Sequence, residues 1–357
     1  MDDERAGKVS REFFETHLAG RFGAQRDDVA LGPTHGADFG VVNVGEAALA
    51  MAADPLFLLR DLGAARAGWF ACQILLSDVA LSGLAPAHLA VSVTLPTDAD
   101  PEAFGQLWAA FDRAARAAGV SITTGHTGTY EGCSYPTVGG GTALAAGDPE
   151  NLVRPTGARP GDAVLVTKGP AIETVGTIAT VFGDELDVTP AERDAARERF
   201  VETSPVADAL LAARTGEVTA LHDATERGLA NAFHELAAAS GVALAVERDA
   251  VPVAPGVTAV CEALGIDPWR ASSAGTVVMT VAPEDATAVE RALREAGIRV
   301  AAVGSVTENG KTPVRVDGAA LPEPDSDPFW PAYAALREQH KPNPPEFSWP
   351  AAYTSKL

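Results

Sequence analysis

Four aspartates in this sequence stand where a carboxylate could do chemistry. Asp38 lies in HGADFGVV, Asp54 follows LAMAA, Asp78 lies in LLSDVALSG, and Asp223 lies in LHDATERGL between an expected strand and an expected helix. A single aspartate at a strand end commonly forms a turn or caps a helix. Carboxylates that converge from several elements instead suit Mg²⁺, which takes hard oxygen ligands, and phosphate chemistry, because the ion neutralises phosphate charge.

Asp78 is the aspartate that a turn or a cap explains least well. Its neighbours Leu75, Leu76, Val79 and Leu81 predict a buried helix face around it. A carboxylate in such surroundings needs a partner charge or a metal ion, because burial of an unpaired charge is costly. A salt bridge to an arginine and a bound Mg²⁺ ion therefore remain the two interpretations.

Two other polar residues have both a functional and a structural interpretation, and a third has a structural one. His126, between two threonines in the glycine-rich segment TTGHTG, could bind phosphate or act as an acid or base, or be a structural loop histidine. Lys168 ends the expected strand AVLVT before Gly169, where it could meet a phosphate or substrate carboxylate or simply be solvated. Glu173 is expected to cap the helix that follows.

The elements that must position these residues fall into two groups. Apolar periodicity predicts helices over 62–83 and 101–119 and strands over 88–95, VSITTG and TVGGGTALA. Residues 147–162 are dense in Gly and Pro, which is typical of a domain boundary. Helices and strands then alternate as in an α/β layer domain. We therefore expect domains over 1–150 and 151–317 and an extended tail, rich in Pro and aromatic residues, over 318–357.

Composition excludes several classes of protein. The 357 residues allow two domains, and 27 Lys and Arg against 48 Asp and Glu give a net charge of −21, which argues against a nucleic-acid partner. The sequence has no run of about 18 apolar residues without charges, so we expect no membrane-spanning helix. The acidic, polar start MDDERAGKVS is unlike a signal peptide, and three widely spaced cysteines fit a reducing compartment. We expect a cytoplasmic protein without a membrane partner.

The order of these motifs resembles the superfamily of aminoimidazole ribonucleotide synthetase (PurM-like), over residues from about 30 to 310. The likeness is greatest to its HypE-like, AIR synthase-related branch. The superfamily's D-D-A-A pattern falls at Ala37-Asp38, its T-D strand end at Ala53-Asp54, its S-D helix at Ser77-Asp78, its G-G-D-T loop at 124–127 and its D-x-T-x-G-G-L turn at 223–229.

The resemblance implies a two-domain α+β fold whose N-terminal mixed sheets pair across a homodimer to form a barrel, with a C-terminal α/β layer domain. ATP would lie between the domains. Its Mg²⁺ ions would be held by Asp38, Asp54 and Asp78, with Ser77, Gly125 and Thr127 also at the nucleotide. Asp223 would close the site from the second domain, and with it His126 and Lys168 would be the catalytic candidates.

The sequence departs from the superfamily pattern at three places. Ala37 replaces the first aspartate of D-D-A-A, and His126 replaces the carboxylate of G-G-D-T, although imidazole suits zinc, iron or manganese better than Mg²⁺. The C-terminus, AAYTSKL, lacks the acceptor cysteine of HypE.

Three hypotheses about function follow from the resemblance and its departures. The first is an ATP-dependent enzyme that uses the γ-phosphate to activate a small-molecule or protein-linked acceptor, whose identity the sequence does not reveal. The second is a nucleotide-binding partner protein without turnover. The third is a thiamine-monophosphate kinase, against which Ala37 and His126 count.

Overall fold

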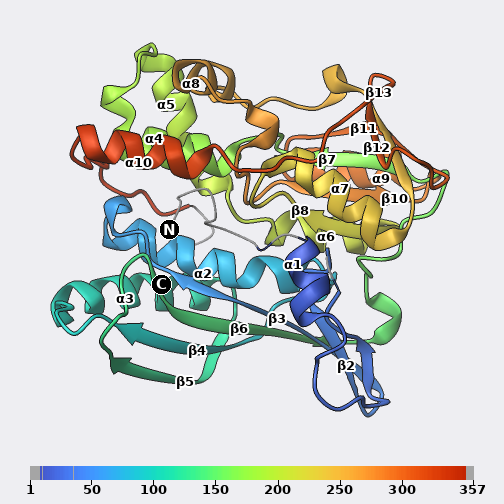
Figure 1. The fold of residues 1–357 in the computed structure, drawn as a ribbon, viewed down its shortest axis with the longest axis horizontal. Helices are drawn as coiled ribbons and strands as arrows, with labels where there is room; N and C mark the ends of the chain where they lie inside the picture. The colour runs from blue at the N-terminus through green and yellow to red at the C-terminus, as the bar shows by residue number, and fades with distance from the viewer. Residues whose placement is uncertain (1–8, 10, 35, 351–357) are drawn as a thin grey trace.

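The computed structural model describes residues 9, 11–34 and 36–350, and it contains two mixed β-sheets (Figure 1). The first sheet has the order β1-β2-β3-β6-β4-β5, and only β4 and β5 run parallel. Its strands are β1 (Val29–Leu31), β2 (Gly40–Val44), β3 (Ala47–Phe57), β4 (His88–Leu95), β5 (Ser121–Thr129) and β6 (Thr137–Gly147).

Two helices, α2 (Ala64–Ala80) and α3 (Pro101–Ala117), pack on one face of the first sheet. The sequence fixes the start of α3 locally, because Asp100 accepts the backbone N–H of Glu102 and Pro101 occupies the first helical position. α2 is buried on nearly every side because it lies between this sheet and the second domain (Figure 1). No helix of the described residues is long and apolar enough to cross a membrane.

The second sheet has the order β13-β12-β9-β11-β7-β10-β8, with β12 and β9 parallel. Its strands are β7 (Ala163–Thr167), β8 (Val218–Asp223), β9 (Ala243–Val246), β10 (Val277–Val281), β11 (Val300–Thr307), β12 (Val314–Val316) and β13 (Ala319–Ala320). Around it lie α4 (Ile172–Phe182), α5 (Pro190–Glu198), α6 (Val206–Thr215), α7 (Gly228–Ser240), α8 (Val257–Leu264), α9 (Ala286–Glu295) and α10 (Phe329–Gln339). The expected α+β architecture of two domains is confirmed, and the Gly- and Pro-rich segment 147–162 lies between the two sheets.

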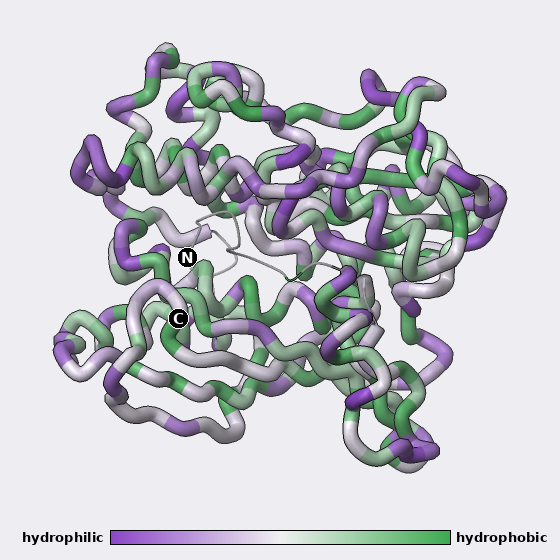
Figure 2. The backbone as a smooth tube through the Cα atoms, in the orientation of Figure 1, coloured by the Kyte–Doolittle hydropathy of each residue, from purple (hydrophilic) through white to green (hydrophobic). Residues whose placement is uncertain are grey.

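One continuous apolar core joins the two domains. The ring of Trp69 on α2 lies 5.5 Å from the ring of Phe200, which belongs to the second domain. The tail adds Phe347, whose ring lies 6.1 Å from that of Trp69. Hydrophobic residues run along α2 and the central strands, whereas hydrophilic residues gather in the outer loops (Figure 2).

Three local expectations were wrong. The apolar runs ALAMAA and LFLL suggest two short strands in the sequence, but ALAMAA and the first two residues of LFLL belong to one strand, β3, which runs through Asp54 and Pro55. TTGHTG is part of strand β5, because Gly125 lets the strand approach β4 closely: a Cβ there would lie 2.2 Å from the carbonyl oxygen of Val91. The tail is not wholly extended, since α10 forms where the apolar residues of PFWPAYAAL recur at helical spacing.

The contact between α2 and α3 gives a first prediction. A Cβ on Gly68 would lie 2.2 Å from the carbonyl oxygen of Leu107, so Gly68→Ala must push the two helices apart. We expect it to lower the free energy of unfolding by about 1–3 kcal/mol or more in urea titrations. The control is Gly105→Ala, on the exposed side of α3 with open space around it, which should stabilise the protein by about 0.5–1 kcal/mol. Wild-type stability of Gly68→Ala would contradict this packing.

Candidate functional site

A buried imidazole lies among carboxylates where the two domains meet. His222 and Asp223 end strand β8, Asp38 precedes β2 in the first domain, and Glu235 lies on α7. The Nδ1 atom of His222 is 3.6 Å from Oδ2 of Asp38, and its Nε2 atom is 3.4 Å from Oε2 of Glu235. The side chain of His222 is 1% exposed, that of Asp38 5% and that of Glu235 8%. We call Asp38, His222, Asp223 and Glu235 the junction cluster.

The hydrogen bond of His222 identifies its neutral tautomer. Nδ1 lies 2.7 Å from the backbone carbonyl oxygen of Asp223, and a carbonyl oxygen can only accept, so Nδ1 carries the hydrogen. In the neutral ring Nε2 then keeps a lone pair, on the side of Glu235. This is the arrangement in which an imidazole can bind a metal ion or take up a proton.

Glycines bring the two domains close enough for the cluster to form. Gly36 has φ +82°, and a Cβ on it would lie 3.1 Å from the carbonyl oxygen of Glu235, so the segment before Asp38 can rest against α7 only with glycine there. On the other side, Arg227 and Gly228 both have left-handed backbone conformations and turn the chain from β8 into α7. A Cβ on Gly228 would lie 2.4 Å from the carbonyl oxygen of Ala271.

More carboxylates lie close to the junction cluster. Glu173, in the first turn of α4, accepts a hydrogen bond from the backbone N–H of Ala274 at 3.2 Å rather than capping its own helix. Burial raises its pKa to about 8, and repulsion from Asp327, Glu226 and Asp223 adds to the shift. This concentration of oxygen ligands, with one imidazole, fits a divalent cation.

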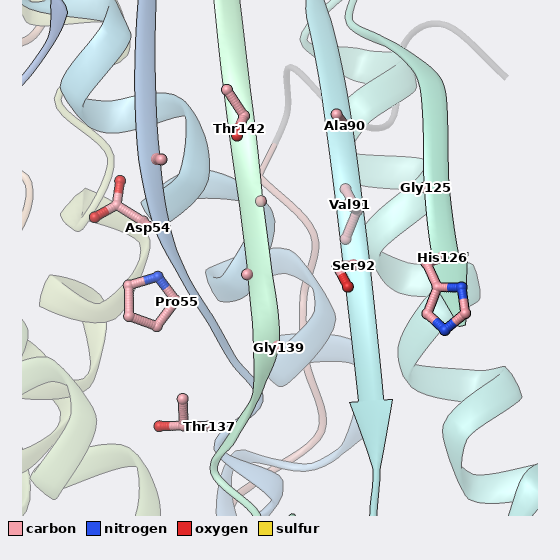
Figure 3. Close-up of a pocket in the computed structure, with 13 residues that line it drawn as sticks. Asp54, Pro55, Ala90, Val91, Ser92, Gly125, His126, Thr137, Gly139 and Thr142 are labelled. Carbon is pink, nitrogen blue, oxygen red and sulfur yellow. The ribbon is translucent and has the colours of Figure 1, made fainter. Parts of the chain in front are cut away.

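Asp54 and His126, expected at one site, lie on opposite faces of the first sheet. Strand register places Asp54 opposite Gly141, on the face that α2 covers, because a Cβ on Gly141 would lie 2.5 Å from Cδ1 of Leu75 on α2. The register also places His126 opposite Ser92, and side chains alternate along each strand, so His126 lies on the open face (Figure 3).

The open face of the first sheet has a cavity of about 670 Å³ (Figure 3). Ser92, Gly125 and His126 line it, together with residues 139–142 of β6 and residues 53–55 of β3, so Asp54 borders this cavity although strand register directs its side chain toward α2. His126 is exposed there, and its Nε2 is 2.6 Å from the hydroxyl of Tyr130. Thr127 follows on β5 but is not among the lining residues.

Ser77 and Asp78, the predicted site residues on α2, differ in burial and hydrogen bonding. The buried Ser77 hydroxyl donates to the carbonyl oxygen of Gln73 at 2.9 Å, so it is engaged within its own helix. Asp78 is partly buried in the last turn of the helix. Its place in the second half of α2 agrees with the expectation of a helical carboxylate beside an apolar core.

Lys168 lies apart from the predicted site chemistry, inside the second domain. Its ammonium donates to the carbonyl oxygens of Ser204 at 2.8 Å and Gly275 at 2.9 Å, and it lies 3.1 Å from Oδ1 of Asp208. Burial raises the pKa of Asp208, and the charge of Lys168 opposes that shift. These contacts account for Lys168 as a structural cation, so a catalytic role for it remains only a prediction.

Two residues of the junction cluster were not foreseen from the sequence. His222 is adjacent to the predicted Asp223, and an imidazole next to a candidate ligand was a usable signal. Glu235 follows His234 in a H-E pair that lacks the second histidine of a metalloprotease helix. Its imidazole partner comes instead from β8, which only the fold brings near.

The pKa of Glu173 gives a pH prediction. Between about pH 4.5, where the unfolded side chain loses its proton, and about pH 8, the folded protein holds a proton that the unfolded chain has lost. This group therefore makes stability fall as pH rises through that window. Glu173→Gln should lose this slope, so that its stability relative to wild type is greater at about pH 9 than at about pH 5. Urea midpoints measured with EDTA test this, and parallel pH profiles would contradict it.

Comparisons with known proteins agree with this architecture. The AIR synthase related protein, N-terminal domain, matches residues 36–146, and the corresponding C-terminal domain matches residues 159–317. The carbamoyl dehydratase HypE of Cupriavidus necator is 32% identical over 243 residues, which is 66% of this chain and 66% of that protein, so the match spans about two thirds of the relative.

Two solved structures share the fold. A structure described as AaThiL complexed with AMPPCP and TMP has a TM-score of 0.66 at 21% identity, covering 82% of this chain and 90% of that one. A structure of the hydrogenase maturation protein HypE in complex with ATP has a TM-score of 0.58 at 23% identity, covering 89% of this chain and 95% of that one. These structures show the shared fold, and the two domain matches show that the chain belongs to the AIR synthase-related family.

Proposed function

We propose that this protein is an ATP-dependent enzyme that uses the γ-phosphate to activate a small-molecule or protein-linked acceptor. The junction cluster is the observation that carries the proposal, because it gathers buried carboxylates from both domains around one point. The relative of this protein in Cupriavidus necator, HypE, is named a carbamoyl dehydratase, and a HypE structure contains ATP. Nucleotide and Mg²⁺ are therefore the ligands we assign to the region between the domains.

Each carboxylate near the junction cluster has a proposed role. Asp38 and Asp223 would hold the metal ion, which neutralises phosphate charge when bound. Asp54 and Asp78 would add oxygen ligands, since Asp54 lies on the sheet face covered by α2, the helix that carries Asp78. With a pKa of about 8, Glu173 keeps its proton at neutral pH, so it adds no negative charge against the phosphates.

A nucleotide-binding protein without turnover is the second candidate. Ala37 removes one family carboxylate, and His126, which replaces another, lies on the open sheet face beside Tyr130. ADP release by purified protein separates the two candidates. A thiamine-monophosphate kinase shares the fold, but Ala37 and His126 depart from its motifs.

Thermal melts of wild type and Asp78→Asn test nucleotide binding. Mg²⁺–ATP at 100 times its Kd should stabilise wild type by about 2.7 kcal/mol. If Asp78 holds metal, Asp78→Asn should fold with near-normal stability but lose most of the ATP response. The control Asp112→Asn, which breaks only the exposed pair with Arg116 on α3, should keep that response.

A structural role for Asp78 predicts a different result in the same melts. If Asp78 is instead a structural ion-pair partner, the variant should lose about 3–5 kcal/mol of stability and still respond to nucleotide. Wild type that shows no shift at millimolar ATP with Mg²⁺ or Mn²⁺ would contradict both leading candidates.

We also propose that two copies pair through the open face of the first sheet. Strand β5 is largely exposed, and an exposed sheet edge and face invite pairing with another chain. An isologous dimer is the commonest closed assembly.

Light scattering at moderate salt should therefore give about twice 36.8 kDa. Ser92→Arg places a charge in the cavity on this face and should give monomers, whereas Asp112→Asn on α3 should stay dimeric. A monomeric wild type would contradict the arrangement.

A further inference from the structure

The junction cluster has a feature that Mg²⁺ chemistry does not require, namely a buried imidazole. We propose that Asp38, His222, Asp223 and Glu235 bind a divalent transition-metal ion, such as Mn²⁺, Fe²⁺, Co²⁺ or Zn²⁺, in preference to Mg²⁺. The inference deepens the proposed function, on which it rests for the location of the site. It requires neither ATP binding nor turnover.

The ligand atoms are close enough for one ion. One ligand atom each of Asp38, His222 and Asp223 lies within 4.8 Å of the other two. The Nε2 atom of His222 is 3.4 Å from Oε2 of Glu235. Donors at about 2.0–2.2 Å from a shared ion are themselves about 3–4 Å apart. Glu235 already lies on the Nε2 side of the ring, and side-chain rotations of Asp38, which now faces Nδ1, and of Asp223 toward that side complete the set.

The chemistry of the ligands selects the class of metal. Imidazole binds zinc, iron and related ions well, whereas Mg²⁺ favours oxygen ligands and keeps several waters. The N–H of Nδ1 donates to the carbonyl oxygen of Asp223, which orients the ring and leaves Nε2 as the coordinating atom. Carboxylates from both domains supply the negative charge that a divalent ion balances.

Asn231 is an independent sign of a ligand here. It lies one turn before Glu235 on α7, and residues four apart share a helix face. The side chain is buried, with 2% of the residue exposed, and its Oδ1 atom accepts no hydrogen bond within the described chain. A buried amide oxygen without a donor is costly, and a metal ion or metal-bound water beside Glu235 would satisfy it.

The competing explanation is purely structural. A protonated His222 could form a bridging ion pair between Asp38 and Glu235 and so lock the two domains together. Such a bridge needs no metal, and removing His222 would then change stability without any effect on metal binding.

Cobalt titration of metal-stripped, full-length protein without nucleotide distinguishes these explanations. We expect one Co²⁺ per chain, visible d–d absorption bands, displacement by Zn²⁺ and none by millimolar Mg²⁺. His222→Gln should weaken Co²⁺ binding by about 100-fold or more and change the bands, because one ligand is lost. The control His234→Gln removes the neighbouring histidine, which bonds the carbonyl oxygen of Leu321, and should leave Co²⁺ binding unchanged.

Glu235→Gln is the second variant, and it also should weaken Co²⁺ binding. It replaces His222→Gln in the test if circular dichroism shows that His222→Gln does not fold. Wild type that takes up no Co²⁺, Co²⁺ that Mg²⁺ displaces at equal concentration, or folded variants with wild-type affinity would overturn the proposal. Cobalt binding without any ATP-induced thermal shift would refute the proposed function and leave this site standing.

Discussion

Carboxylates surround one imidazole at the junction of the two domains. The contacts that hold the two domains together keep these side chains close to one another. Asp38 comes from the first domain, whereas His222, Asp223 and Glu235 come from the second. Burial of like charges disfavours the folded state unless a cation or a proton compensates them. Glu173, at the edge of this region, shows the same effect. Burial and neighbouring carboxylates raise its pKa, so that the carboxyl group holds its proton.

Such a cluster can persist only if the domains are held together by other means. The continuous core connects them, and the contact between the rings of Trp69 and Phe200 is part of it. The tail strengthens it, because Arg66 on α2 donates to the carbonyl oxygen of Glu346, and Phe347 packs on Trp69. The cluster is therefore built on rigid elements, which is what preorganised binding of a charged ligand requires.

Much of this architecture could be predicted from local patterns. Helical periodicity identified α3, and the alternation of HLAVSVTL identified β4. The α10 helix was missed because Pro328 and Pro331 favoured an extended chain, although Pro331 falls in the first turn, where a helix tolerates proline.

The site was harder to predict because it depends on contacts between distant segments. Asp38 and Asp223 were identified as candidates, but the carboxylate of Glu235 reaches His222 only because β8 and α7 turn back on each other through Gly228. The face of a strand residue also depends on register. Pairing with Gly141 places Asp54 under α2, whereas pairing with Ser92 places His126 on the open face. Neither pairing is visible in the sequence.

If the junction cluster is the functional site, metal and nucleotide meet there. Anomalous diffraction at the manganese edge, from crystals grown with Mn²⁺ and a non-hydrolysable ATP analogue, tests it most directly. We expect an anomalous peak within coordination distance of Asp38, His222 and Asp223, with the phosphates of the nucleotide beside it. An ordered nucleotide bound elsewhere, or a junction cluster without a peak under these conditions, would contradict it.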